Sequence, residues 1–139
     1  MPDSALRVRL RVDSDARLVR GVAAAAGFLA RQCNLSKEAV RDLKAATEGA
    51  VRDTLPLLSE TGGPLDVCLE GFEDRVEIIL EHHGEALPSA GLDTFLNAGA
   101  MDASAGGAFS GLALLNLVDR VLYNTTNGTS RTTLVKYRK

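Results

Sequence analysis

A glycine-rich run leads directly into an amphipathic helix pattern, and this combination is suited to holding phosphate. The run is Gly106-Gly107-Ala108-Phe109-Ser110-Gly111, and Leu112, Leu115, Val118 and Leu122 follow at three- and four-residue spacing. Glycines allow close approach of the backbone to a ligand. A helix N-terminus presents free N–H groups with partial positive charge. The pattern therefore indicates either an anion site at Gly106, Gly107 and Gly111 or a flexible connector.

A second candidate for chemistry is Glu48, which lies in a helix pattern between two cations. Lys44, Glu48 and Arg52 are four residues apart, which places them in one row on a helix surface. Such rows stabilise an exposed helix face by about 0.3–0.5 kcal/mol per pair. Two interpretations of Glu48 stay open, namely a structural salt-bridge row and a catalytic base.

Histidines and cysteines are the next candidates, and their spacing argues against a metal site. Adjacent strand residues point to opposite faces, so His82 and His83 are not expected to share one ion. Cys33 and Cys68 are far apart and lack the close Cys or His spacing of zinc sites. We predict no metal site, two buried free thiols, and His82 on the polar rim of a shallow pocket.

The overall composition is that of one ordinary globular domain, which we place at residues 1–139. The chain has 45% hydrophobic and 24% charged residues and a formal net charge of −2. This balance gives no electrostatic case for binding nucleic acid or an acidic membrane surface. Gly21–Ala30 is too short to span a bilayer, and the first residues lack the pattern of a signal peptide. We therefore expect a cytoplasmic protein.

The first half of the chain predicts a strand followed by two helices. Residues 6–12 alternate apolar side chains with Arg7, Arg9 and Arg11, which is typical of a half-buried strand. Ser14 is the expected N-cap of a helix that runs to about Cys33. Ser36 is the expected N-cap of a second helix, which Gly62-Gly63-Pro64 ends. The apolar stripe of this second helix comprises Val40, Leu43, Thr47, Ala50, Val51, Thr54, Leu55 and Leu58.

The second half predicts two hairpins separated by a long loop and a third helix. Residues 65–69 and 76–80 alternate as strands around a turn at 71–74. A loop over 83–108 and a helix to about Asp119 follow, then a hairpin around Asn127-Gly128. The expected fold is α/β (α+β), a two-layer sandwich. Its sheet is mixed but mostly antiparallel, with about three helices on one face.

With these elements in this order, the chain resembles the GHKL ATPase superfamily. It is most similar to the bacterial anti-sigma-factor serine kinases of partner-switching systems. The similarity in element order covers nearly the whole chain, whereas the motifs are only partly present. The resemblance implies a histidine-kinase-like ATPase fold in which 83–108 is a degenerate ATP lid.

The resemblance also implies roles for particular residues. Glu48 matches the family's catalytic Glu, and Arg52 stands where the family has the Asn that holds Mg²⁺. His82 replaces the adenine-binding Asp and Gly84 matches the first glycine after it, while Ala86 replaces the second glycine. Gly111 matches the second glycine of the phosphate motif, with Phe109 at the place of the first. Each nucleotide motif thus lacks a principal ligand, since a guanidinium carries only donors and does not bind Mg²⁺.

The functional expectation is a divergent anti-sigma-factor-like regulator that acts by protein–protein binding, with weak or absent catalysis and no required cofactor. The alternative is an active ATP-dependent protein serine kinase that uses ATP and Mg²⁺. In this alternative Glu48 is the base, and Arg52, His82, Gly84, Gly106, Gly107 and Gly111 surround the nucleotide. The expected partner is a sigma factor or an anti-sigma antagonist. The basic face at Arg7, Arg9 and Arg11 is either solvated or the contact of a homodimer.

Overall fold

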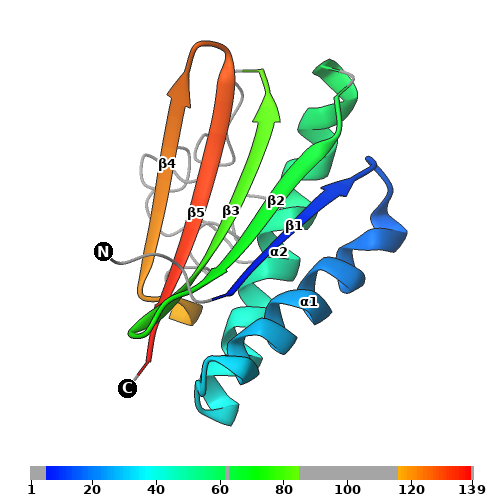
Figure 1. The fold of residues 1–139 in the computed structure, drawn as a ribbon. Helices are drawn as coiled ribbons and strands as arrows, with labels where there is room; N and C mark the ends of the chain where they lie inside the picture. The colour runs from blue at the N-terminus through cyan, green and yellow to red at the C-terminus, as the bar shows by residue number, and fades with distance from the viewer. Residues whose placement is uncertain (1–5, 62, 85–115, 139) are drawn as a thin grey trace, which may run out of the picture.

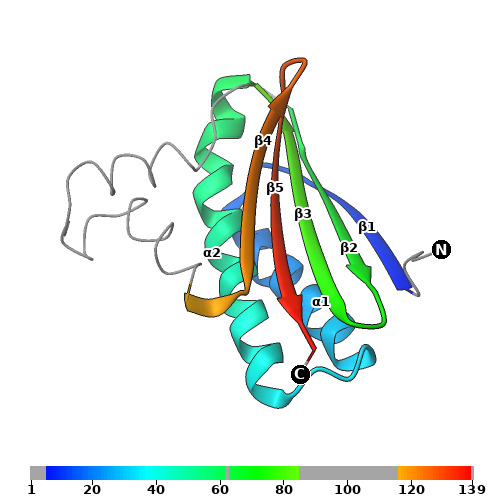
Figure 2. The ribbon, with the colours of Figure 1, turned by 90° about the vertical axis from the view of Figure 1, so that its left-hand side faces the viewer.

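Five antiparallel strands form one sheet, and two helices cover one of its faces (Figure 1, Figure 2). The computed structural model describes residues 6–61, 63–84 and 116–138. The strands are β1 (Leu6–Val12), β2 (Leu65–Gly71), β3 (Arg75–His83), β4 (Arg120–Thr126) and β5 (Thr129–Tyr137). The helices are α1 (Val19–Gln32), which follows the 3-10 turn η1 (Ala16–Leu18), and α2 (Lys37–Thr61).

The sheet order is β1-β2-β3-β5-β4, and every neighbouring pair of strands is antiparallel. The predicted α+β class and two-layer arrangement are therefore confirmed, while the parallel component implied by a mixed sheet is not found among the described strands. Two helices are described. The predicted third helix lies largely outside the described residues, as do Gly106, Gly107, Gly111 and nearly all of the 83–108 loop.

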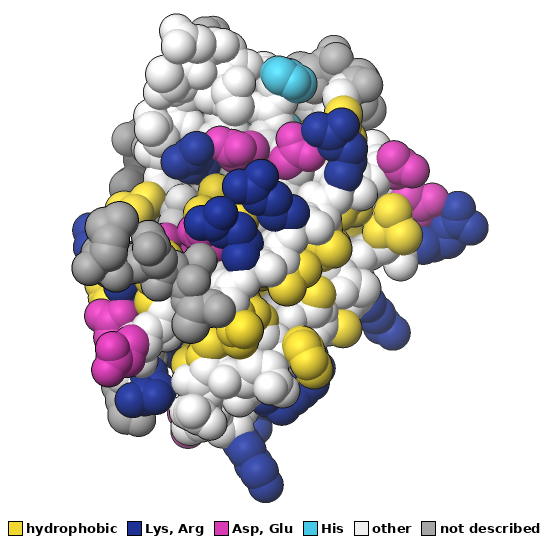
Figure 3. All heavy atoms as spheres, viewed as in Figure 1, with side chains coloured by type: hydrophobic (Ala, Val, Ile, Leu, Met, Phe, Trp, Pro, Cys, Tyr) yellow, Lys and Arg dark blue, Asp and Glu magenta, His cyan; other side chains and the backbone are white. Residues whose placement is uncertain are grey.

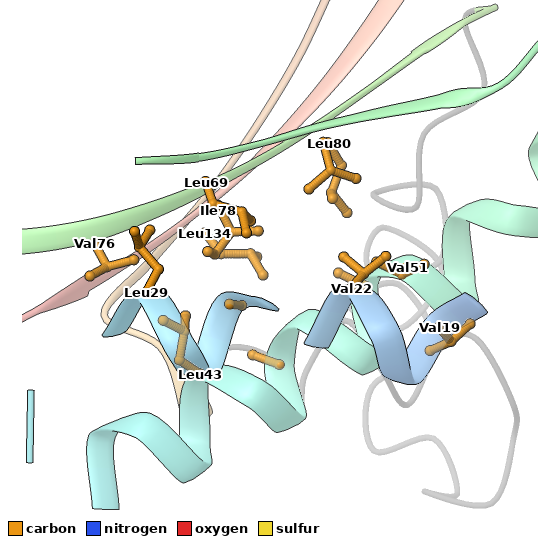
Figure 4. Packing of buried hydrophobic residues seen from close by; sticks show 14 of the residues in the cluster. Val19, Val22, Leu29, Leu43, Val51, Leu69, Val76, Ile78, Leu80 and Leu134 are labelled. Atoms are coloured by element: carbon orange, nitrogen blue, oxygen red, sulfur yellow. The ribbon is translucent and has the colours of Figure 1, made fainter. Parts of the chain in front are cut away.

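The core lies between the sheet and the two helices. Alternate residues of β2 and β3 are buried along their whole length, as period-two patterning requires. α1 packs on β2, and α2 packs on β3 and β5. Figure 4 shows Leu69, Ile78 and Leu134 pointing from three neighbouring strands towards Leu29 and Leu43 of the helices.

The start of the first helical segment differs from the prediction by one residue. Asp15, not Ser14, is the N-cap, because its side chain accepts a hydrogen bond from the Arg17 N–H at 2.9 Å. The Ser14 hydroxyl instead donates to the Leu55 carbonyl at 3.3 Å and ties this segment to α2. The side-chain and backbone hydrogen bonds from Arg17 lower the pKa of Asp15 to about 2.

The second helix begins and ends as predicted. The Ser36 hydroxyl accepts a hydrogen bond from the Ala39 N–H at 3.1 Å, and α2 continues to Thr61 before the glycines. Every member of its predicted stripe is buried. No helix within the described ranges is long and apolar enough to cross a membrane.

Both predicted hairpins are present. Asn127 and Gly128 have φ values of 53° and 76°, as a type I′ turn between β4 and β5 requires. The turn between β2 and β3 is closed by a hydrogen bond from the Phe72 N–H to the Arg75 carbonyl at 2.8 Å. The two turns join β2 to β3 and β4 to β5, and β3 pairs with β5 between the two hairpins.

Candidate functional site

Glu48 and Arg52 form an ion pair on the surface of α2. Their charged atoms are 3.4 Å apart, and the side chains are 31% and 63% exposed. Lys44, the third residue of the expected row, turns instead across α1, where a Cβ on Gly27 would lie 2.5 Å from its Cδ. Of the two ion pairs in the predicted row, the Glu48–Arg52 pair is therefore present, and no Lys44–Glu48 pair is found among the described residues. The catalytic role of Glu48 stays a prediction.

His82 is buried and does not sit on an exposed rim, which corrects the sequence-based expectation. It is 4% exposed because it continues the buried face of β3, and His83 is exposed on the other face. Its Nδ1 donates to the His83 carbonyl at 2.9 Å, and its Nε2 has no hydrogen-bond partner among the described residues. Within the described residues, no group of three or more potential ligands is placed to hold a metal.

Gly84 has a structural role at the end of β3. Its N–H donates to the Gly128 carbonyl at 2.7 Å, and its carbonyl accepts from the Ser130 hydroxyl at 2.6 Å. Its φ of 106° is accessible to glycine and costly for other residues. No hydrogen bond or ion pair between described residues joins Gly84 or His82 to Glu48 or Arg52, so the four do not form one polar cluster.

The sheet face opposite the helices carries charges of both signs, as Figure 3 shows. A hollow of about 610 Å³ lies on it, lined by residues of β1, β2, β3 and β5. Most of these charges are paired within the sheet, by Arg7 with Glu70 at 2.7 Å, Arg11 with Asp66 at 3.0 Å and Arg131 with Glu81 at 2.6 Å. The face is therefore largely balanced electrostatically, and the homodimer contact stays a prediction.

A second hollow has a different character, and the turn between the helices builds it. α1 ends in a Schellman motif in which the Leu35 N–H donates to the Ala30 carbonyl and the Asn34 N–H to the Arg31 carbonyl, both at 3.1 Å. Asn34 adopts the left-handed conformation with φ 64°. This reversal turns Leu35 inward, to 8% exposure, before Ser36 starts α2.

The resulting groove lies where α1 passes into α2, at the lower end of the helical layer in Figure 1. Its volume is about 410 Å³, and Leu35 and Val40 form its apolar floor. Its rim consists of Arg31, Lys37, Arg41 and Lys44. None of the four rim cations forms an ion pair with a carboxylate of the described residues. We call this site the basic groove.

The comparisons with known proteins identify a shared fold. The chain matches one chain of the crystal structure of the SiaB-SiaC complex from Pseudomonas aeruginosa. The TM-score is 0.61 at 9% sequence identity, over 92% of this chain and 88% of that one. No protein-family model and no curated protein sequence matches.

This match corrects the assignment to the GHKL ATPases. A solved structure that shares the fold is described as the SiaB-SiaC complex and not as a GHKL ATPase. Several α+β families share a similar order of elements, so this order alone did not discriminate between them. The residues that argue against a GHKL ATPase are those that depart from its motifs. The main one is Arg52, which pairs with Glu48.

Sequence reasoning missed the basic groove, although the chain carries a signal for it. Residues 16–37 contain four cations and no acidic residue. Lys37, Arg41 and Lys44 then recur at the spacing of one helix face, where like charges repel. Sequence analysis also did not foresee that the interhelical turn would add Arg31 and Leu35 to the same site.

Neither cysteine is arranged as a nucleophile. Both thiols are free, and burial raises the pKa of Cys33 and of Cys68. Both thiols are therefore protonated near neutral pH and poorly nucleophilic. Burial also raises the pKa of Tyr123, and the charge of Asp53 adds to the effect. The prediction that both thiols are free is confirmed, whereas the predicted burial is only partial, since both side chains are half-buried.

The left-handed residue that ends α1 provides a test of how the groove is built. Replacing Asn34 with alanine is expected to destabilise the protein by about 1 kcal/mol, because alanine lacks the tolerance of asparagine for this conformation. Asn34→Gly is the matched control and is expected to be neutral or slightly stabilising. Urea denaturation of the three proteins checks the order. Equal stabilities of the two variants would contradict the Schellman ending.

Proposed function

We propose that this chain is a regulatory protein that acts by binding another protein, as a component of a partner-switching pathway does. The basic groove carries this proposal. Four cations that lack a carboxylate partner among the described residues surround an apolar floor, and such a surface suits contact with a partner protein. That a structural neighbour is a chain of the SiaB-SiaC complex supports the same proposal.

The surface around the groove adds an aromatic side chain. Phe28 lies one turn before Arg31 on α1 and is 55% exposed, the highest value among the exposed large hydrophobic residues described. Aromatic and arginine side chains are enriched among the residues that dominate binding energy in interfaces. We propose that a sigma factor or an antagonist competes with a second partner for this helical surface, so that regulation follows from exchange.

Photo-crosslinking in cells of the source organism tests the proposal. A benzoylphenylalanine at position 28 is expected to yield a covalent complex with at least one different protein, identifiable by mass spectrometry. The same probe at Leu122, 44% exposed on the opposite face, is the matched control. If no position yields a heterocomplex, the binding proposal fails.

The absence of a required cofactor stays a prediction that calorimetric titration with Mg·ATP tests.

A further inference from the structure

The charge on the groove rim specifies what kind of partner fits. Four cations surround one hollow, although the chain as a whole carries a net charge of −2. On α2, Lys37 and Arg41 repel each other at i, i+4 spacing, and no described carboxylate pairs with either. An acidic ligand relieves this repulsion and supplies the missing countercharges.

Lys44 is held over the groove by its packing on α1. Gly27 leaves space for the Lys44 stem, since a Cβ at that position would lie 2.5 Å from Cδ and 2.6 Å from Cγ. The aliphatic stem therefore covers α1 at Gly27, and Lys44 is also one of the residues that line the groove. The rim is thus partly preorganised, which reduces the entropy lost when a ligand binds.

The floor distinguishes a protein ligand from other anions. Leu35 and Val40 give the groove an apolar base, and Phe28 extends apolar surface next to Arg31. A nucleic acid would require a longer basic track than the four cations of this rim. A polypeptide that carries both carboxylates and aliphatic side chains matches the rim and the floor together.

We infer that the basic groove binds an acidic segment of the partner protein, with aliphatic side chains of that segment on Leu35 and Val40 and its carboxylates on the rim. This inference rests on the proposed function and names the chemistry of the partner. Binding is expected to weaken as salt rises, because the rim is exposed and its charges are screened.

The test begins with an unbiased probe. A library of random peptides displayed on phage is selected on the purified full-length protein. We expect selected peptides to be enriched in Asp and Glu together with Leu, Ile or Val. A selected peptide is then labelled with fluorescein, and its affinity is measured by anisotropy. Selection of peptides without acidic enrichment would overturn the inference.

Variants then locate the bound peptide. Lys44→Glu combined with Arg41→Glu is expected to weaken binding by at least about ten-fold, because attraction becomes repulsion at two rim positions. Arg9→Glu reverses a single exposed charge on the sheet face opposite the helices and is expected to leave affinity unchanged. If the double reversal does not fold, Arg41→Gln with Lys44→Gln is used, with a loss of several-fold expected. An equal loss in Arg9→Glu overturns the inference.

Two further binding measurements distinguish a peptide ligand from RNA and from anionic membranes. A peptide with its aliphatic residues replaced by Ser is expected to lose most of its affinity. If that peptide binds as well as the parent, or if RNA or anionic vesicles bind with the same dependence on Arg41 and Lys44, the groove is a general anion surface and the inference fails. Photo-crosslinks at Leu122 but not at Phe28 would overturn the inference while leaving the proposed function standing.

Discussion

Replacing Ile78 with alanine is expected to lower the free energy of unfolding by about 2–5 kcal/mol. Ile78 lies in the middle of the central strand β3 and has 0% exposure. Its partners across the two neighbouring strands, Leu69 and Leu134, are equally buried. Alanine at this position leaves a cavity that the rigid sheet does not close. Ile78→Val removes one methylene and is expected to cost about 0.5–1.5 kcal/mol.

The neighbouring residue is an internal control for this prediction. Ile79 belongs to the same strand but points to the face that the helices leave open, where it is half-buried opposite Cys68 and Thr133. Ile79→Ala is therefore expected to cost about 1 kcal/mol or less. Urea denaturation followed by circular dichroism measures both losses.

The contrast between the two isoleucines also tests the layer arrangement. If Ile79→Ala were as costly as Ile78→Ala, the open sheet face would be covered in solution. A dependence of that cost on protein concentration would then identify a homodimer as the cover. A small, concentration-independent cost leaves the open sheet face exposed to solvent.

Local patterns predicted much of the fold because each depends on a few neighbouring residues. The alternation of arginines with apolar residues over 6–12 specifies a strand with one buried face, and β1 has these bounds. The Ser36 cap and the stripe of α2 were likewise predictable. The error at the first helix arose because Ser14 and Asp15 are both competent N-caps, and a 3-10 turn selects the second.

The site was less predictable because it depends on how distant segments pack. His82 was expected on a polar rim, although its spacing from Leu80 continues the buried face of β3. Ser130 of β5 lies opposite His82 and is also a buried polar residue, as is Thr132. A local sequence pattern on β3 does not reveal these neighbours on another strand. The basic groove requires the end of α1 beside the start of α2, which only the structure shows.

Replacing Gly71 with alanine is expected to destabilise the protein by about 1–3 kcal/mol, because the added methyl group overpacks the core. Gly71 is buried at the end of β2, where the end of α1 approaches the strand. A Cβ at this position would collide with the Cys33 Sγ, whereas its distances to Leu6 Cβ and Leu29 Cδ1, 3.7 and 3.9 Å, are ordinary contacts. The cysteine is thus the specific obstacle.

The clash has a specific rescue. The Cys33 N–H donates to the Leu29 and Ala30 carbonyls at 3.0 and 3.2 Å, so its backbone is held and its side chain must give way. Cys33→Ala removes the sulfur, and Gly71→Ala combined with Cys33→Ala is expected to be more stable than the sum of the two single effects predicts. A double-mutant cycle from urea denaturation measures this coupling, which we expect to be about 1–2 kcal/mol.

Thiol chemistry gives an independent measurement of the same contact. In a Cys68→Ser background, where Cys33 is the remaining thiol, Gly71→Ala is expected to speed the reaction of Cys33 with Ellman's reagent. The displaced side chain loses the burial that now raises its pKa, so more of it is thiolate at a given pH. Additive stabilities together with an unchanged rate would mean that α1 does not approach β2 at Gly71. The same end of α1 carries Arg31 and the turn to Leu35, so this measurement also tests how the basic groove is anchored to the sheet.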